Sequence, residues 1–244
     1  MQNDPRFDSD IPQPDTHLCH QQSGMSISRV DFTDRSTIIP VMNTSVDTKQ
    51  RIIDSAQELI YARSYTDVGV QEICNRAGVK KGSFYHFFPS KRDLTLAVLD
   101  QLEQFFRDSV QDNAFSSDRS PLERIDRLIE LIYEFQRQTR EDSGQILGCP
   151  FGNLAGEMST QDEQIRQRVM HIFRGIEARI AESLEDAIAT GELADINVQA
   201  SAEAIFAYIE GIVLIAKARN DPEVISKLGK AVRGLMVHAT MVKE

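Results

Sequence analysis

The sequence predicts an all-α protein of about nine helices. From residue 47 onward, apolar residues recur at intervals of three and four, which is the period of an amphipathic helix. No segment of useful length alternates apolar and polar residues as a half-buried strand does. We therefore expect an N-terminal three-helix domain followed by a larger helical domain.

Three short helices open the periodic part of the chain. The first is capped by Asp or Thr at positions 47–48. The second spans residues 70–77 and ends at Gly78, because glycine tolerates the left-handed turn that closes many helices. The third spans residues 80–87, is rich in aromatic residues and ends before Pro89.

Longer helices follow. Ser90 is a favourable cap for a helix whose apolar stripe extends to residue 106. Pro121 is suited to the first turn of the next helix, which runs to about residue 139. The glycine-rich stretch after it is expected to be a loop over 144–156. The remaining helices are expected at 165–191, 200–218 and 222–241, and the second of these is apolar on nearly all sides, which predicts burial.

Composition divides the chain into a tail at 1–45, a domain at 46–106 and a second domain at 107–244. The tail holds four prolines and many polar residues without a sustained period, which predicts disorder. Met42, just before the first helix, is an alternative start of the native chain. The tail also contains a short His/Cys cluster (17–20), but a flexible segment makes a poor metal site, so we expect no metal and no cofactor.

The net charge of -10 argues, for the chain as a whole, against a nucleic-acid partner, because DNA attracts a basic surface. Residues 46–95, however, carry eight basic and six acidic side chains, so a small basic unit precedes a large acidic one. Three cysteines do not suggest a disulfide-stapled secreted protein. We find neither a signal peptide nor an uncharged apolar run near the roughly 20 residues of a membrane span, and expect a cytoplasmic protein without a membrane segment.

The two short helices that meet at Gly78 have the arrangement of a helix-turn-helix, whose second helix enters the major groove of DNA. Lysines near the N-terminus of that helix add positive potential. Lys91 lies in the first turn of the next helix, where the dipole disfavours a cation, and a phosphate neighbour would account for it. Solvated lysines and helix pairs that never bind DNA are the alternatives. The candidate DNA contacts are Gln71, Lys80, Lys81, Gly82, Ser83, Tyr85, His86 and Lys91.

The segment from about Thr48 to Asp100 resembles the DNA-binding domain of the TetR family of bacterial transcriptional regulators. This resemblance implies a regulator, usually a repressor, that is not an enzyme and that binds double-stranded DNA at a palindromic operator. It also implies a homodimer formed by the last two long helices. The family often has Thr or Ser before the second helix, where this chain has Gly69 without a hydroxyl, and Gln71 is the candidate substitute. The resemblance is carried by Ile73, Ala77-Gly78-Val79, Lys81-Gly82-Ser83-Phe84-Tyr85, His86-Phe87 and Ser90-Lys91.

The segment Gly148–Glu157 is similar to an electrophile-sensing, NemR-like branch of the family. That similarity implies Cys149 as a sensor and Lys217 as its partner, since a helix terminus and an ammonium both favour the reactive thiolate. The alternative is that Cys149 is a small buried hydrophobe and that the effector binds without a covalent bond. The candidate lining of an effector cavity also includes Phe106, Phe135, Phe151, Phe173 and Tyr208.

The sequence thus predicts a DNA-binding regulator that a small apolar or electrophilic effector releases from its operator. The effector would act by moving the long helix that starts at Ser90. A Cys149-dependent enzyme is one alternative, but neither His171 nor His238 has a recognisable acid partner for such chemistry. A helical interaction module without DNA binding is the other.

Overall fold

The structure, a computed structural model, describes residues 48–238, with side chains to residue 235. These residues form eleven α-helices and one π-helical turn, and no strand occurs among them, so the all-α class is confirmed. If the uninterrupted helical run 91–114 and the nearly continuous run 223–238 are each counted as one helix, the described residues contain the expected nine. The predicted disordered tail, the alternative start at Met42 and the end of the last predicted helix lie outside the described residues.

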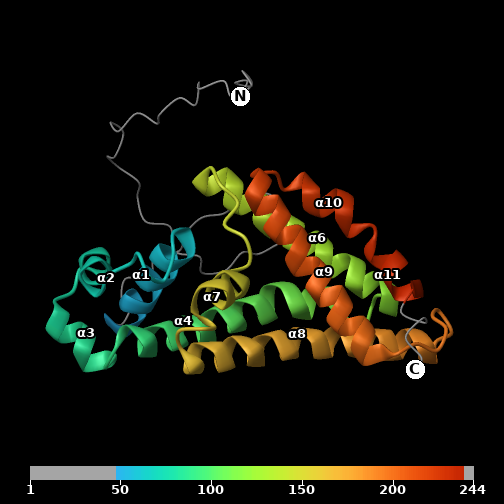
Figure 1. Cartoon of the computed structure of the whole chain (residues 1–244), viewed down its shortest axis with the longest axis horizontal. Helices are drawn as coiled ribbons and strands as arrows, with labels where there is room; N and C mark the ends of the chain where they lie inside the picture. Colours follow the sequence, from blue (N-terminus) through green and yellow to red (C-terminus); the bar gives the residue numbers. More distant parts are fainter. Residues whose placement is uncertain (1–47, 239–244) are drawn as a thin grey trace, which may run out of the picture.

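A small three-helix domain forms one end of the molecule (Figure 1). It consists of α1 (Thr48–Ala62), α2 (Val70–Ala77) and α3 (Lys81–Phe87), packed against the start of α4 (Lys91–Phe106). Gly78 ends α2 with φ 65°, so the predicted left-handed turn is confirmed. The fully buried side chains of this domain include Ile52, Ile73, Phe84 and Leu94.

The helix α4 joins the two ends of the molecule. Its Ser90 cap is confirmed, because the Ser90 hydroxyl accepts a hydrogen bond from the Asp93 amide. The helix continues without interruption through the π turn η1 (Arg107–Gln111) and α5 (Asp112–Ala114). The domain boundary expected at residue 106 therefore falls inside a continuous helical segment.

The larger part of the molecule is a bundle of long helices, α6 (Pro121–Ser143), α8 (Glu163–Ala189) and α9 (Val198–Arg219) (Figure 1). The final helix expected at 222–241 is broken at residues 230–231 into α10 (Glu223–Gly229) and α11 (Val232–His238). Both short helices pack on α9, and α10 also packs on α6.

The loop expected over 144–156 is wrong for its second half, which forms α7 (Pro150–Met158). Pro150 occupies the first turn, and the Cys149 sulfur caps the helix by accepting a hydrogen bond from the Gly152 amide at 3.3 Å. Phe151 and Leu154 bury one face of this helix. Local capping and burial therefore outweigh the low helix propensity of its glycines.

Among the described residues one helix, α9, has the length and apolar composition of a membrane span. In this structure it packs against α8 and α10, and Ile205, Ile209 and Val213 are buried in the bundle. Composition alone does not separate such a core helix from a span. Its outer face leaves Leu214 66% exposed and Ile215 38% exposed.

Candidate DNA-binding surface and effector cavity

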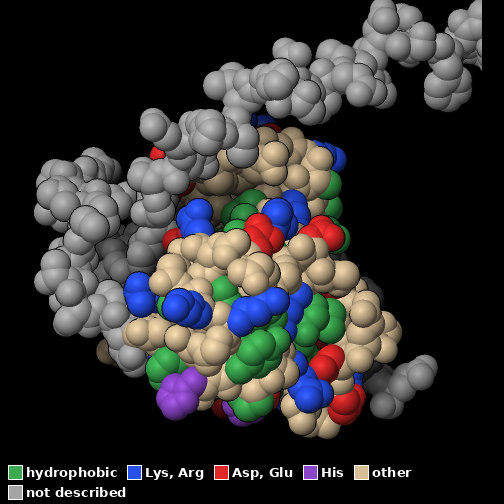
Figure 2. All heavy atoms as spheres, turned by 90° about the vertical axis from the view of Figure 1, so that its left-hand side faces the viewer, with side chains coloured by type: hydrophobic (Ala, Val, Ile, Leu, Met, Phe, Trp, Pro, Cys, Tyr) green, Lys and Arg blue, Asp and Glu red, His purple; other side chains and the backbone are tan. Residues whose placement is uncertain are grey.

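The helix-turn-helix lies at the far end of the small domain, where α2 and α3 meet across Gly78. Phe84 and Ile73 are fully buried and fix the two helices together. Figure 2 views the molecule from this end, and lysine and arginine side chains spread across the face. Lys80 precedes α3 in extended backbone, and Lys80, Lys81 and Gly82 are exposed, so the first turn of α3 is open to solvent.

Most of the predicted DNA contacts are accessible on this face. Tyr85 is 54% exposed although it is large and aromatic, and its ring meets that of the buried Phe84 edge-on. A Cβ on Gly82 would meet no atom within 4 Å, so the fold itself does not require glycine there. Ser83 is half-buried, and the remaining exposed candidates are Gln71, Lys80, Lys81 and His86.

Gly69 precedes α2 without a side-chain cap, as its lack of a hydroxyl requires. The Gln71 amide, the candidate substitute, donates instead to the Asn75 side chain at 2.9 Å. That bond lies on the exposed surface, so it holds Gln71 in place without burying it.

Lys91 differs from the other candidates because it is half-buried between the two parts of the molecule. Its ammonium donates to the Tyr65 carbonyl and lies 4.0 Å from the centre of the Tyr65 ring. Burial lowers the pKa of Lys91, and the nearby Glu157 carboxylate opposes that shift. The fold itself thus supplies partners for this cation, so its place in the first turn is explained without a phosphate, and a DNA contact by Lys91 stays a prediction.

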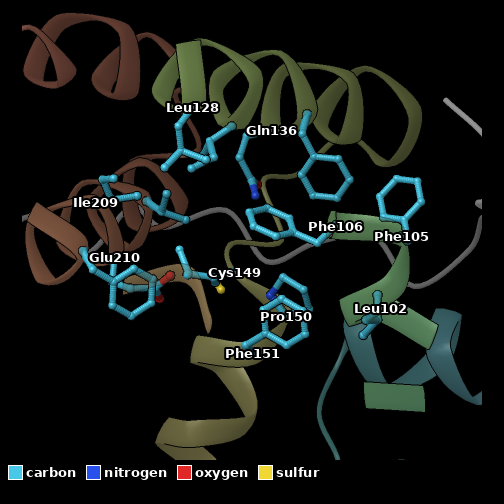
Figure 3. Close-up of a pocket in the computed structure, with 15 residues that line it drawn as sticks. Leu102, Phe105, Phe106, Leu128, Gln136, Cys149, Pro150, Phe151, Ile209 and Glu210 are labelled. Atoms are coloured by element: carbon cyan, nitrogen blue, oxygen red, sulfur yellow. The ribbon is translucent and has the colours of Figure 1, made fainter. Parts of the chain in front are cut away.

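A mostly apolar cavity of about 60 Å³ lies where α4, α6, α7 and α9 meet (Figure 3). Phenylalanine rings form much of its wall, with Phe105 near Phe135 and Phe106 edge-on to Phe151. Among the side chains that line it, Gln136, Cys149 and Glu210 bring polar groups.

The cavity includes four of the seven residues predicted for effector sensing, namely Phe106, Phe135, Cys149 and Phe151. The other three do not line it. Phe173 packs against Phe206 with ring centres 5.0 Å apart, and the Tyr208 hydroxyl donates to the Leu228 carbonyl at 2.8 Å. The Lys217 ammonium donates to the Asn153 side chain at 2.8 Å, beside a second and more open hollow.

The electrostatic surroundings of Cys149 are the reverse of those expected. Burial, and then the neighbouring Glu210 carboxylate, raise the pKa of the Cys149 thiol well above its ordinary value. The Lys217 ammonium, the expected partner of the sulfur, donates to the Asn153 side chain. Burial and the Glu210 carboxylate thus oppose the thiolate that the family resemblance implies, and a sensing role of Cys149 stays a prediction.

The helix α7 connects the cavity with the helix-turn-helix domain. At its start, Gly148 accepts hydrogen bonds on its carbonyl from the Tyr61 hydroxyl of α1 at 2.7 Å and from Gln136 at 3.0 Å. At its end, the Glu157 carboxylate accepts from the backbone amides of Tyr65 at 2.8 Å and Thr66 at 2.7 Å. The segment 148–158, which contains α7, thus touches the cavity wall and two places in the small domain.

Two family models match the chain. The model described as "Bacterial regulatory proteins, tetR family" matches residues 52–98, and "Tetracyclin repressor-like, C-terminal domain" matches residues 121–232. An HTH-type transcriptional regulator from the lacX 3' region of Lactococcus lactis is 33% identical over 179 residues, which cover 73% of this chain and 88% of that protein. This chain belongs to the TetR family.

Other relatives of this TetR-family chain agree. The transcriptional regulator AcuR of Cereibacter sphaeroides is 31% identical over 71% of this chain and 78% of its own length. The crystal structure of the regulatory protein TetR from Rhodobacter sphaeroides superposes with TM-score 0.70 at 30% identity, covering 78% of this chain and 99% of that one. Reduced Escherichia coli NemR superposes with TM-score 0.66 at 25% identity, covering 78% and 98%.

The TetR-family chain is therefore a transcriptional regulator with a helix-turn-helix DNA-binding domain, and it is not an enzyme. NemR of Escherichia coli is among the relatives found, 27% identical over 146 residues, in agreement with the resemblance to a NemR-like branch. Both alternatives drawn from the sequence, a Cys149-dependent enzyme and a module without DNA binding, are set aside.

Sequence reasoning missed three polar residues of this regulator. Glu210 carries a charge in an otherwise apolar stretch, and that contrast was a usable signal. Gln136 exchanges two hydrogen bonds with the Gly148 backbone, a pairing over twelve residues that no local pattern indicates. For Glu157, burial alone would raise the pKa, but hydrogen bonds from Thr66 and Tyr65 and the nearby Lys91 hold it below its ordinary value.

Proposed function

We propose that this TetR-family regulator is a cytoplasmic repressor that binds a palindromic operator as a homodimer and leaves it when a small molecule occupies the phenylalanine-lined cavity. Residues 46–106 would read DNA, and residues 107–244 would bind the effector and dimerise. The observation that carries this proposal is the connection through α7, which touches the cavity at Cys149 and the small domain at Tyr65 and Thr66.

The proposed DNA contact is made by α3 in the major groove. Lys80 and Lys81 would approach phosphates, and Ser83, Tyr85 and His86 would reach phosphates or base edges. Within the described part of the chain neither lysine has an ion-pair partner, which leaves both ammonium groups available to phosphates. Gln71 on α2 would make a flanking contact, whereas Lys91 would have to leave Tyr65 to reach DNA.

The proposed dimer forms through α9, α10 and α11. Leu214 and Ile215 on α9 and Leu228 on α10 are large apolar side chains that are exposed on these helices. Exposed apolar residues that gather on one face favour a protein partner. A second copy of the chain would bury them and would place two helix-turn-helix units on successive major grooves of a palindrome.

The proposed switch begins with the cavity walls. Phe106 belongs to α4 and Phe151 to α7, so a molecule between their rings moves both helices that lead to the small domain. An effector that binds better to the moved arrangement shifts the population away from the DNA-binding one.

A gel-shift experiment tests the DNA-binding part of this proposal. Duplexes selected from a random pool, and the DNA upstream of the regulator's own gene, are incubated with the full chain at low salt. We expect specific retardation, a steep loss of affinity with rising salt, and at least about tenfold weaker binding by Tyr85→Ala. Arg174→Ala, which changes an exposed residue of α8, is the control and should bind normally. No specific retardation on any selected duplex refutes the proposal.

A further inference from the structure

The cavity contains a carboxylate without a cationic partner. Glu210 projects from α9 toward Cys149 (Figure 3), and its one side-chain partner among the described residues is that thiol. Its carboxylate lies so close to α7 that a Cβ on Gly152 would clash with the Oε2 atom. No lysine or arginine belongs to the cavity lining drawn from residues 48–238.

A carboxylate in such a place is costly to the folded protein. Glu210 is half-buried, and the partial loss of water around its carboxylate raises its pKa, which means that the apolar surroundings disfavour its charge. A buried ionisable group without a counter-ion destabilises a fold, and a neutral side chain of similar size would avoid that cost. Groups of this kind occur preferentially where a ligand or a reaction uses their charge.

The walls opposite the carboxylate are suited to a cation with an apolar body. Phe105 and Phe135 have ring centres 6.3 Å apart, and those of Phe106 and Phe151 are 6.1 Å apart. Aromatic faces attract cations and also bury alkyl groups. The volume of about 60 Å³ is below the roughly 150 Å³ of an engineered cavity that binds benzene, which favours a ligand of a few heavy atoms.

We propose that this cavity takes a small organic cation, an amine on a short apolar chain, whose charge pairs with Glu210 while its carbon atoms lie among the phenylalanine rings. The inference rests on the proposed function in that it makes this cavity the effector site. A neutral apolar effector leaves the Glu210 charge without a use, and an organic anion is repelled by it.

A charge series of equal size tests the inference. Binding of n-butylamine, 1-butanol and butyrate to the full-length chain is measured by calorimetry at neutral pH. We expect the amine to bind at least about tenfold more tightly than the alcohol, and butyrate to bind most weakly. Glu210→Gln should bring the amine and the alcohol within about twofold of each other. Glu203→Gln, an exposed position two turns earlier on α9, is the matched control and should keep the preference.

The wild-type chain alone can overturn the inference, so it does not depend on the folding of a variant. Equal binding of amine and alcohol, tighter binding of butyrate, or a preference that survives in Glu210→Gln each contradicts it. Operator retardation is measured on the same preparation. Retardation without an amine preference overturns this inference and leaves the regulator proposal intact. An amine preference that requires Glu210, found without operator retardation, supports this inference and overturns the regulator proposal.

Discussion

The bond between Glu157 and the small domain offers a quantitative test of how the two parts of the regulator are joined. Replacing Glu157 by alanine removes the acceptor of two backbone hydrogen bonds, those from Tyr65 and Thr66. A hydrogen bond to a charged group contributes about 1.5–3 kcal/mol net. Thr66 is exposed and Tyr65 only half-buried, so both amides regain water in the variant, and we expect a total loss of about 1–2 kcal/mol rather than the full sum.

Hydrogen exchange of the two amides measures this loss directly. A change of about 1–2 kcal/mol in local opening corresponds to roughly 5–30-fold faster exchange at residues 65 and 66. Glu185→Ala, an exposed position on α8, serves as the control and should leave both amides unchanged. Unchanged protection in Glu157→Ala would refute the claim that this carboxylate holds the α1–α2 connection to α7.

The pH dependence of amide protection tests the same two hydrogen bonds independently. The pKa of Glu157 is lowered in the folded protein, so its contribution to stability is fully present above the ordinary value of 4.5. That contribution is lost as the pH falls through the lower folded value. Protection of the Tyr65 and Thr66 amides should therefore decrease below about pH 4.5 in the wild type more than in Glu157→Ala.

Four further outcomes are expected. Lys81→Ala should weaken operator binding about tenfold and reduce the slope of log affinity against log salt by about one in fluorescence polarisation; an unchanged slope means that Lys81 contacts no phosphate. Leu214→Glu should convert the proposed dimer into monomers in sedimentation experiments, because the charge replaces a side chain that is 66% exposed on the proposed interface, and a persistent dimer rules that interface out. Cys149 should react with iodoacetamide at pH 7 more slowly than free cysteine, since its thiol pKa is raised, and a faster reaction contradicts the assigned surroundings. Gly152→Ala should displace the Glu210 carboxylate, whose flexible end lies where the new Cβ would be, and should therefore weaken the amine preference; an unchanged preference contradicts the assigned position of the carboxylate.

Features that depend on neighbouring residues were predictable from the sequence. The left-handed end of α2 at Gly78 and the Ser90 cap of α4 each need only a few adjacent residues, and both are present. The α7 helix was missed because its glycines suggest a loop and because a cysteine is an unusual cap. Its stability comes from Phe151 and Leu154 packing into a core that distant helices form.

The positions of side chains along a shared face were not predictable. Glu210 and Lys217 are seven residues apart on α9, so they lie on nearly the same face but about 10 Å apart along the axis. The sequence indicates that both side chains lie on this face, but it does not indicate which of the two positions along the axis lies beside Cys149. The structure places the carboxylate there and leaves the ammonium beside Asn153, which reverses the expected charge around the thiol.

The hydrogen bonds at Gly148 restrict how this protein can be recombined with its relatives. Its carbonyl holds both a hydroxyl from the small domain and an amide from the bundle, and a side chain there would approach Lys217 within 2.9 Å. A chimaera that joins the DNA-binding domain of a relative to the helical bundle of this chain would need a tyrosine at the position of Tyr61 to donate the hydrogen bond to Gly148. Biosensor designs that exchange one domain without this tyrosine would lose the proposed coupling between the domains even if both domains fold.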